Sequence, residues 1–493
     1  MRFEMIEAAR AVGGSFAVAP ANEHVYVTSL TWDSRAVQPG ALYVALPGER
    51  VDGHDFAAAA IAAGAVCVLA QHALDDAAVR AAREAGAGVI EVASTAEAVT
   101  ALARAWRSCL AGRVIGITGS TGKTTTKNLV RDVLAAAGTV VATKGNQNNE
   151  LGVPNTVLTA DAGTANVVVE MGMRGLHQLD ALCEFVRPEW GLVTNVGESH
   201  IELLGSRENI ARAKAELLEA LPAGGMAFVN AANDMTPQLR AFANLQEHGV
   251  TCVLYDGSAE AAEHRAALSA TDAAAPAVWA TDIALDAQGC PRFTINAANF
   301  AGMTAPISGA CALELRGMHN VSNACSAAAV GLAAGMTLAQ VIAALGGAQA
   351  ESGRQEVLQT PSGVTVVNDA YNANPDSMRA SLSTFAALEV SGRRIAVLGD
   401  MGELGDFAPA LHEEVGAFAA GCGLDELVCT GELAQRIAAG AKTAGMPVDR
   451  VAVVGDWQEA LAHVAPEVAA GDAVLVKASH FMGLERVVEG LVK

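Results

Sequence analysis

The sequence predicts an α/β protein of three domains, in which the central domain is a doubly wound, mainly parallel sheet. The first observation is the length of 493 residues, which exceeds what one hydrophobic core supports and predicts about three domains. The second is that short apolar runs alternate with amphipathic helical patterns, as in open parallel sheets. The third is a glycine-rich loop between one such run and one such helix.

The expected first domain, residues 1–91, is a small α/β unit. Strand-like runs occupy residues 25–27 and 41–46, and a Gln-Pro-Gly turn at residues 38–40 precedes the second run. Proline and glycine at this spacing favour a turn. A helix followed by a strand is expected next, and the strand ends this unit at residues 65–69.

The expected central domain, residues 92–349, begins with a helix at residues 95–110. Apolar strands then recur with helical patterns between them, which indicates a parallel sheet. The predicted strands are residues 114–118, 166–170, 191–196 and 226–230. A more antiparallel insertion follows, with strands at residues 278–285 and 292–296 around a turn at 286–289.

The expected third domain, residues 350–493, repeats the alternation of strands and helices without a second phosphate loop. Its predicted strands are residues 364–368, 394–399, 426–430, 450–454 and 473–477.

The composition excludes several classes of protein. A net charge of −21 argues against nucleic acid, whose phosphates repel an acidic surface. The apolar runs are shorter than the roughly 18 residues that a membrane helix needs, and the N-terminus lacks the apolar segment of a signal peptide. Nine cysteines without a CxxC pair fit thiols in a reducing compartment. We therefore expect a cytoplasmic protein without membrane insertion.

The glycine-rich loop, residues 116–126, has the composition of a nucleotide phosphate site. An apolar run enters the loop and a helical pattern, residues 127–137, leaves it, so backbone N–H groups and a helix dipole point at one spot. Lys123 would reach the β- and γ-phosphates, and the Thr124 hydroxyl would bind Mg²⁺. The strict spacing places glycine at position 117, where this chain has Ile117 and the glycine one residue earlier. The loop predicts that the protein uses ATP.

Three further residues could complete a metal site where the predicted strands end. Glu170 ends a buried strand, and a carboxylate beside a phosphate loop suits Mg²⁺. His200 follows the next predicted strand, and Lys214 lies in the helical run 208–220. Each also has a plain structural interpretation: a strand-end glutamate in a solvated turn, a structural histidine, and a surface lysine that forms i,i+4 pairs. The residue patterns leave both interpretations open.

A series of separated motifs identifies the chain, over its whole length, as resembling the Mur ligase family of cell-wall amide ligases. The motifs are residues 33–35, 39–45, 52–54, 119–126, 145–154, 170–173, 194–200, 213–216, 317–323, 353–354, 368–375, 398–405 and 477–479. The resemblance implies three domains, with a Rossmann-like C-terminal domain that closes on the nucleotide. Residues 230–234 carry Ala232 where relatives often have an acid, so this segment is assigned no role.

The resemblance implies the site residues one by one. It implies ATP contacts at Gly119, Ser120, Thr121, Gly122, Lys123, Thr124, Thr125, Asn320, Asn323, Arg354 and Asp369. It implies metal contacts at Thr124, Glu170, His200 and Lys214, the lysine as a carbamate formed with CO₂. It implies catalytic roles for Lys123, Glu170, His200, Lys214 and Arg354. It implies substrate contacts at Ser34 and Arg35 for the UDP end, at Asn146, Asn148 and Asn149 for the muramoyl peptide, and at Tyr371, Asn372 and Asn374 for D-Ala-D-Ala.

The resemblance also implies the reaction. Within the family it is closest to enzymes that join D-alanyl-D-alanine to UDP-N-acetylmuramoyl-tripeptide through an acyl phosphate, with ATP and two Mg²⁺, in peptidoglycan precursor synthesis. A monomer is expected. The alternatives are the ligase that adds the third peptide residue, a folylpolyglutamate synthase and, outside enzymes of this type, a P-loop switch ATPase. A switch would not need the N-terminal substrate motifs or the Arg354 and Asp369 pair.

Overall fold

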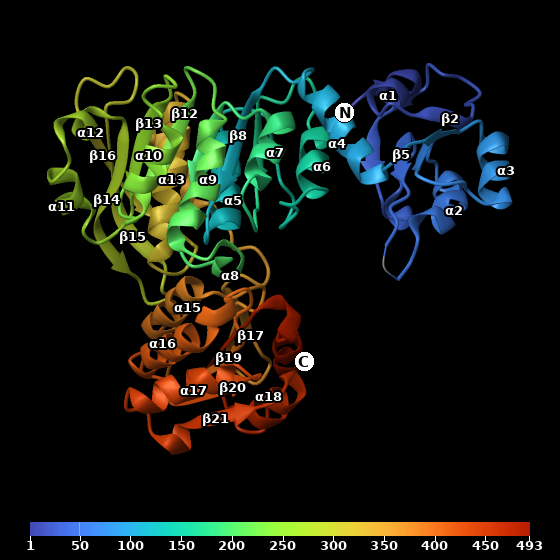
Figure 1. Ribbon diagram of the computed structural model, residues 1–493. Coiled ribbons are helices and arrows are strands. Elements are labelled where there is room, and N and C mark those ends of the chain that lie inside the picture. Colours follow the sequence, from blue (N-terminus) through green and yellow to red (C-terminus); the bar gives the residue numbers. More distant parts are fainter. Residues whose placement is uncertain (49) are drawn as a thin grey trace. The chain divides into compact units, whose positions relative to one another are not determined.

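The computed structural model (Figure 1) describes residues 1–48 and 50–493. By its internal contacts it divides into two compact units. Unit 1 comprises residues 1–117, 138–173 and 179–191, and unit 2 comprises residues 118–137, 174–178 and 192–493. In the described part of the chain, no helix is long and apolar enough to cross a membrane. The nine cysteines form no disulfide there.

Unit 1 contains a five-stranded sheet in the order β2-β7-β6-β5-β4. Strands β4 to β7 run parallel to one another, and β2 pairs with β7 in the antiparallel sense. Alanine-rich faces of α2 and α3 pack on strand residues such as Tyr43 and Val68 in one buried cluster. The Asp75 side chain caps α3 by accepting a hydrogen bond from Ala78 N, which explains where that helix begins.

Unit 1 also contains the parallel strands β8, β10 and β9, which neighbour one another in that order. The Val and Ile side chains of β8 and β10 are buried on both faces, as in a sheet covered on both sides, whereas β9 at the edge is half-buried. The elements that lie wholly or mostly in unit 1 are β1 (Phe3–Glu4), α1 (Met5–Ala11), β2 (Ser15–Val18), β3 (Tyr26–Val27), β4 (Ser29–Thr31), β5 (Ala41–Val44), α2 (Ala57–Ala62), β6 (Cys67–Ala70), α3 (Asp76–Ala85), β7 (Gly88–Glu91), α4 (Thr95–Arg107), β8 (Arg113–Thr118), β9 (Val140–Ala142), α6 (Gly152–Thr159), β10 (Asn166–Glu170) and α7 (Gln178–Val186).

The first part of unit 2 combines parallel and antiparallel strands. Strands β12, β13 and β14 are parallel, whereas β14, β15 and β16 are antiparallel, which confirms the predicted insertion. The elements are α5 (Lys123–Ala135), α8 (Ile201–Leu204), α9 (Arg207–Glu219), β12 (Met226–Asn230), α10 (Thr236–Ala243), β13 (Thr251–Asp256), α11 (Ala261–Ala266), α12 (Ala270–Ala274), β14 (Ala277–Leu285), β15 (Pro291–Ala298), β16 (Ile307–Ala312), α13 (His319–Ala333) and α14 (Leu338–Gly346). Strand β11 (Trp190–Val193) begins in unit 1 and ends in unit 2.

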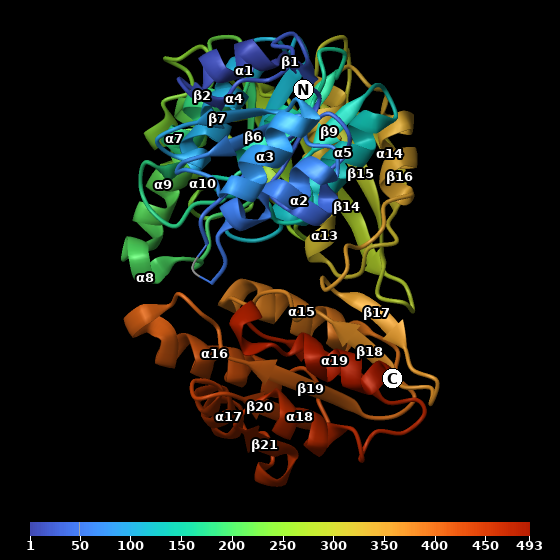
Figure 2. The ribbon, with the colours of Figure 1, turned by 90° about the vertical axis from the view of Figure 1, so that its right-hand side faces the viewer.

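The C-terminal part of unit 2 is a six-stranded sheet in the order β17-β18-β22-β19-β20-β21. All neighbours are parallel except the edge pair β17 and β18. Figure 2 shows the strands between α16 and α17 on one side and α18 and α19 on the other. The elements are β17 (Glu356–Gln359), β18 (Thr365–Asn368), α15 (Pro375–Ala387), β19 (Arg394–Gly399), α16 (Ala408–Ala420), β20 (Glu426–Thr430), α17 (Ala434–Thr443), β21 (Val451–Val454), α18 (Trp457–Val464), β22 (Ala473–Lys477) and α19 (Glu485–Val492).

Alternate strand residues face the two helical layers of this sheet. Ile395 and Val397 of β19 lie in one buried cluster with Val464 of α18 and Val487 of α19. Because side chains alternate along a strand, the buried Leu398 faces the other layer,. The sheet is therefore apolar on both faces, as the predicted runs required.

Most predicted strands match the observed ones within two residues. Two of the larger differences have identifiable reasons. The strand predicted over 191–196 ends at Val193, because Thr194 and Asn195 instead bond to the phosphate loop. The helix predicted from residue 127 begins at Lys123. Its N-cap is Gly122 in the left-handed conformation, so the helix starts where the loop ends.

Candidate active site

The phosphate loop in unit 2, residues 118–125, requires glycine at two positions. Gly119 has φ +150°, and a Cβ placed on it would lie 1.8 Å from Thr194 Oγ1. Gly122 has φ +75°, and a Cβ there would lie 2.7 Å from Asn323 Oδ1. Only glycine fits both the backbone conformation and the close approach. The loop thus brings backbone N–H groups to the first turn of α5, an arrangement that favours anions.

Asn195 holds the loop in shape from the neighbouring strand end. Its Oδ1 accepts from Ser120 N at 3.2 Å and from Thr121 N at 2.9 Å, and its Nδ2 donates to Thr121 Oγ1 at 2.6 Å. Thr194 Oγ1 donates to Thr121 O at 2.6 Å. Sequence reasoning included Asn195 in a motif but assigned it no role. An asparagine directly after a strand end was the available signal.

Lys123 lies over the loop that it follows. Its Nζ donates to Gly119 O at 2.7 Å, so the ammonium is held above the loop backbone. Thr124, one residue further along α5, is buried. A cation and a buried hydroxyl at one helix N-terminus are the groups that a polyphosphate with its metal ion would use.

Lys214 is not a surface lysine. The side chain on α9 is 1% exposed, and this burial lowers its pKa well below the usual lysine range, while the charge of Lys123 lowers it further. Burial therefore favours the neutral amine, the form that can act as a nucleophile. The interpretation of Lys214 as an exposed lysine in i,i+4 pairs is wrong.

His200 is oriented by a carboxylate. It has φ +65° at the start of α8, and its Nδ1 forms an ion pair with Glu403 Oε2. The hydrogen bond from His200 is the largest factor that lowers the pKa of Glu403. Arg174 Nε lies 3.3 Å from the same carboxylate. Metal-binding histidines commonly present one ring nitrogen while a carboxylate holds the other, so His200 suits the predicted role through Nε2.

Glu170 lies in unit 1, at the end of β10. The side chain is buried, and its Oε1 accepts from Asn148 Nδ2 at 2.8 Å. Its backbone N–H donates to Thr143 Oγ1 at 2.9 Å. Asn148, which the sequence placed at the substrate, therefore orients Glu170. Asn149 Oδ1 accepts from Gly152 N at 3.0 Å at the start of α6, and Asn146 is exposed.

Ser34 and Arg35 lie in a short 3₁₀ turn of unit 1, residues Ser34–Ala36. Arg35 forms a two-point pair with Asp33, with Nε–Oδ1 and Nη2–Oδ2 distances of 2.9 Å. These hydrogen bonds lower the pKa of Asp33 to about 2. The Arg35 side chain is otherwise exposed.

Asn320 and Asn323 lie one turn apart at the start of α13. Asn323 Nδ2 donates to Asn320 Oδ1 at 2.8 Å, and Asn320 Nδ2 donates to Arg316 O at 2.6 Å. Asn323 Oδ1 accepts from Thr126 Oγ1 at 3.2 Å. This bond and the approach to Gly122 place the two amides next to the phosphate loop.

The C-terminal strand ends bring together Arg354, Asp369 and Tyr371. The Arg354 guanidinium carbon lies 4.2 Å from the centre of the Tyr371 ring, a cation–π contact. Asp369 Oδ1 accepts from Gln355 N at 3.3 Å, and its Oδ2 lies 2.8 Å from Lys477 Nζ. Lys477 had no predicted role.

Asn374 connects α15 to the segment after β11. Its Oδ1 accepts from Ser377 N at 2.9 Å and so caps α15, while its Nδ2 donates to Ser199 Oγ at 2.8 Å. Asn372 Oδ1 accepts from Ala373 N at 2.9 Å. Within unit 2, the structure thus brings predicted dipeptide-binding residues next to the segment that contains His200.

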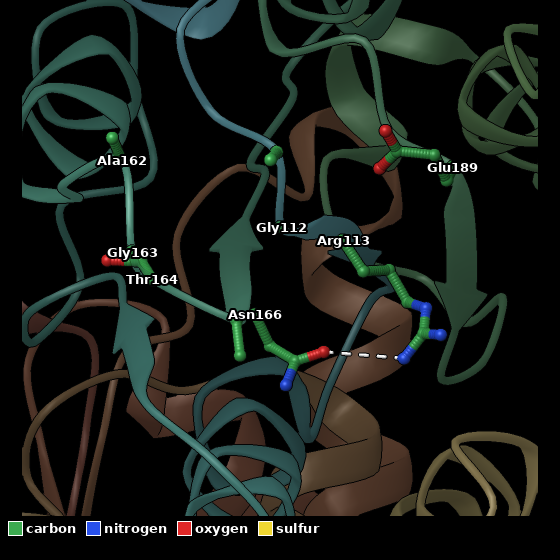
Figure 3. A pocket seen from close by; sticks show the side chains of 9 residues that line it. Gly112, Arg113, Ala162, Gly163, Thr164, Asn166 and Glu189 are labelled. Atoms are coloured by element: carbon green, nitrogen blue, oxygen red, sulfur yellow. Dashed lines mark hydrogen bonds between the residues drawn. The ribbon is translucent and has the colours of Figure 1, made fainter.

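Two other features lie apart from these residues. A cavity of about 600 Å³ at the amino ends of β8 and β10 in unit 1 is lined by Arg113, Asn166 and Glu189 among others (Figure 3). Arg113 Nη1 donates to Asn166 Oδ1 at 3.4 Å there. The cavity contains none of the predicted site residues, and the phosphate loop follows the opposite end of β8.

The second feature is a cluster of Asp52, His54 and His72 in unit 1. His54 Nδ1 lies 2.5 Å from Asp52 Oδ1, and His54 Nε2 accepts from Gln71 N at 3.0 Å. An Nε2 acceptor requires the proton on Nδ1, where a metal would need a lone pair. The arrangement is therefore that of a hydrogen-bonded histidine and not of a metal ligand.

Three family models match the chain. The model described as "Mur ligase family, catalytic domain" matches residues 26–107, "Mur ligase middle domain" matches residues 117–331, and "Mur ligase, glutamate ligase domain" matches residues 353–480.

Curated relatives match over nearly the full length. A protein of Mycobacterium tuberculosis H37Rv named UDP-N-acetylmuramoyl-tripeptide–D-alanyl-D-alanine ligase is 40% identical, and the match covers 98% of this chain and 96% of that protein. A Bacillus subtilis protein of the same name is 33% identical, with 96% and 95% covered.

Solved structures are similar as well. MurF from Acinetobacter baumannii superimposes with a TM-score of 0.82 at 27% identity, over 100% of this chain and 99% of that one. MurF ligase from Thermotoga maritima in complex with ADP gives a TM-score of 0.74 at 25% identity, over 94% and 97%.

Proposed function

This chain belongs to the Mur ligase family, and from that premise we propose that it joins D-alanyl-D-alanine to UDP-N-acetylmuramoyl-tripeptide with ATP. The products are the UDP-muramoyl-pentapeptide, ADP and phosphate. The observation that carries the proposal is a phosphate loop near a fully buried lysine, in a chain that resembles UDP-N-acetylmuramoyl-tripeptide–D-alanyl-D-alanine ligases over nearly its full length.

The nucleotide phosphates bind at the N-terminus of α5. Backbone N–H groups in the first turn of α5 and the Lys123 ammonium supply positive charge there,. Asn320 and Asn323 lie next to Gly122 and contact the adenine side. Arg354 and Asp369 contact the phosphates and the ribose from the C-terminal domain, which excludes water when it closes on the nucleotide.

Two Mg²⁺ ions would be held by Thr124, Glu170, His200 and Lys214. Bound Mg²⁺ neutralises phosphate charge during transfer. An ammonium cannot bind Mg²⁺, whereas a carbamate offers anionic oxygens. Burial favours the neutral Lys214 amine, the form that can make a carbamate: its nitrogen bonds to the carbon of CO₂ and a proton leaves. The burial of Lys214 and the carboxylate-held His200 support this donor set.

The reaction proceeds in two displacements. The terminal carboxylate of the tripeptide attacks the γ-phosphorus and ADP leaves, while Lys123 and Arg354 stabilise the charge on the transferred group. The amine of D-alanyl-D-alanine then attacks the acyl phosphate, phosphate leaves, and the amine loses a proton. The protein supplies position rather than a nucleophile.

The substrates are divided between the ends of the chain. Ser34 and Arg35 bind the UDP end, and Asn146, Asn148 and Asn149 serve the muramoyl peptide, with Asn148 acting through Glu170. Tyr371, Asn372 and Asn374 bind D-alanyl-D-alanine. The stacked pair of Arg354 and Tyr371 supports an arrangement in which nucleotide and dipeptide lie side by side.

The test is ADP formation by the purified full chain with ATP, Mg²⁺, UDP-muramoyl-tripeptide and D-alanyl-D-alanine, with the product identified by mass spectrometry. We expect ADP only when both acceptor substrates are present. Each tripeptide, with lysine or diaminopimelate as third residue, is assayed separately. A requirement for UDP-muramoyl-dipeptide and a diamino acid would identify the preceding ligase, and turnover with a folate and glutamate would identify a folylpolyglutamate synthase. ATP turnover indifferent to all substrates would identify a switch ATPase.

A further inference from the structure

We propose that Lys477 is a positioning residue that fixes the Asp369 carboxylate and the Asn372 carbonyl to each other, and thereby couples ATP binding to dipeptide binding. The proposal rests on the proposed function, which assigns Asp369 to ATP and residues 371–374 to D-alanyl-D-alanine. Lys477 is a buried cation to which the proposed function gives no role.

The position of Lys477 follows from the strand register. Strands β18 and β22 are parallel neighbours, with Asn368 opposite Val476. Asp369 N continues the ladder by donating to Val476 O at 3.0 Å. The residue after β18 and the last residue of β22 therefore lie side by side at the same edge of the sheet, where parallel sheets place their ligands.

Three acceptors surround the Lys477 ammonium, and all three belong to the loop that follows β18. Nζ lies 2.8 Å from Asp369 Oδ2, donates to Asn372 O at 2.8 Å, and reaches Asp369 O at 3.5 Å. The side chain is 2% exposed. A buried cation is stabilised by such pairing and hydrogen bonding, and these contacts hold the three oxygens around one point.

The same strand end supports the next part of that loop. Ser479 Oγ accepts from Gly402 N at 2.9 Å and lies 3.4 Å from Ala373 O. The loop between Asp369 and Asn374 is thus attached to β22 at successive carbonyl groups. Unlike Ser479, Lys477 also holds a side chain that is proposed to contact a ligand, the Asp369 carboxylate.

The ATP side of the pair is equally ordered. Asp369 Oδ1 accepts from the backbone of Gln355, the residue after Arg354. His319, the neighbour of Asn320, lies near the pair: its pKa is lowered to about 4, chiefly by burial, while Asp369 opposes this shift and Lys477 adds to it. Because the imidazole next to the pair is neutral, the positive charge opposite the Asp369 carboxylate comes from Lys477. Without that cation, the Asp369 carboxylate would no longer be held in place for the nucleotide. The Asn372 carbonyl would likewise no longer be held in place beside the dipeptide.

The first experiment is Lys477→Met, which keeps the chain length and removes every donor. The expected result is a rise of about tenfold or more in KM for both ATP and D-alanyl-D-alanine, the usual effect of losing a hydrogen bond to a charged group. The KM for the UDP-muramoyl-tripeptide is expected to stay within about twofold, and kcat is expected to change less than either affected KM.

A double-mutant cycle separates the two arms of the contact. Asp369→Asn alone is expected to raise the ATP KM. In that background, Lys477→Met is expected to add little to the ATP KM but to raise the dipeptide KM as it does in the wild type. If Lys477→Met does not fold, Lys477→Gln keeps a donor for the Asn372 carbonyl and is expected to raise the ATP KM more than the dipeptide KM.

The matched control is Arg393→Met, which breaks another ion pair of the same sheet. Arg393 Nη2 lies 3.1 Å from Asp472 Oδ2, next to the amino end of β22. This variant is expected to lower Tm without changing any KM. The proposal would be overturned if Lys477→Met lowered Tm as the control does and left every KM unchanged. An equal rise in all three KM values would also overturn it. Wild-type protein without dipeptide-dependent ADP formation would instead refute the proposed function, before any variant is made.

Discussion

The phosphate loop and the strand ends of the C-terminal sheet hold charged groups in different ways. The loop uses backbone: Gly119 and Gly122 adopt conformations that side chains would prevent, and Asn195 bonds to two of its N–H groups. The C-terminal sheet uses buried side-chain charge: Lys477 pairs with Asp369 and reaches a carbonyl. Both regions lie where parallel strands end, so the topology alone does not decide which kind of site is built.

The difference predicts how each region fails. A backbone site fails when a side chain is added or when its supports are removed, because the N–H groups lose their directions. A site of buried charges fails when one partner is removed, because the other is left uncompensated. Lys214 is the exception on the phosphate-loop side: it is a buried amine rather than part of a backbone cradle.

Lys214→Ala tests that exception and has the largest expected effect. If the Lys214 amine becomes a metal ligand as its carbamate, the variant loses at least about 10³-fold in kcat, in the range of other transition-state charge stabilisers. A short-chain carboxylic acid such as acetate, which can occupy the space left by the side chain, is expected to restore part of the activity. The measurement is ADP formation against acetate concentration.

The control for this prediction is Leu217→Ala on the same helix. Leu217 is fully buried, so its truncation costs about 2–5 kcal/mol of stability without removing an amine. It is expected to lower Tm, retain activity and show no response to acetate. Full activity of Lys214→Ala without any added acid would exclude the carbamate.

Gly119→Ala tests the backbone side of the comparison. The added Cβ meets Thr194 Oγ1, which itself donates to Thr121 O, so the loop must move. A displacement of this kind costs about 100-fold in a positioned reaction, and we expect it as a rise in the ATP KM. Gly224→Ala is the matched control, because Gly224 has φ +84° with open space around it. It is expected to cost about 1 kcal/mol of stability and to leave the ATP KM unchanged.

The phosphate loop and the C-terminal strand ends also differ in how far the sequence predicts them. The loop and the strand beside it are contiguous, so their composition predicted the fold locally, and β10, β12, β19, β20 and β22 have the predicted bounds. The contact of Lys477 with Asp369 joins residues 108 positions apart and depends on the register of β18 and β22. Periodicity could not decide whether Lys214 is exposed or buried, because it reports one helix and not the elements packed around it.

Asn195→Ala asks whether the backbone site depends on its side-chain support. The variant removes acceptors for the N–H groups of Ser120 and Thr121 but adds no bulk. Because each hydrogen bond contributes about 1 kcal/mol, we expect the dissociation constant for ADP to rise about tenfold, a smaller effect than that expected for Gly119→Ala. Isothermal titration with ADP measures it. An unchanged ADP affinity would show that the glycines alone hold the loop.

The smallest effects come from two carboxylates, one on each side of the comparison, whose pKa values shift in opposite directions. Burial, with Asp376 and Glu414 nearby, raises the pKa of Glu198 against the opposing charges of Arg379 and Arg207. Glu198 therefore costs stability once pH exceeds its raised folded pKa, and the cost disappears below the unfolded value. Glu403, held by His200, has a lowered pKa. It adds stability above its unfolded pKa and loses this contribution as pH falls through the folded value.

Thermal melts of Glu198→Gln and Glu403→Gln between pH 4 and pH 8 measure both contributions. At pH 8 we expect Glu198→Gln to melt about 1–3 °C above the wild type and Glu403→Gln about 1–3 °C below it. Both differences should shrink towards pH 4, since protonation makes each wild-type carboxyl resemble the amide. Changes of the same sign at pH 8 would mean that the two residues share one environment. Opposite signs would mean that a half-buried negative charge costs stability in the segment after β11, whereas one adds stability in the loop after β19.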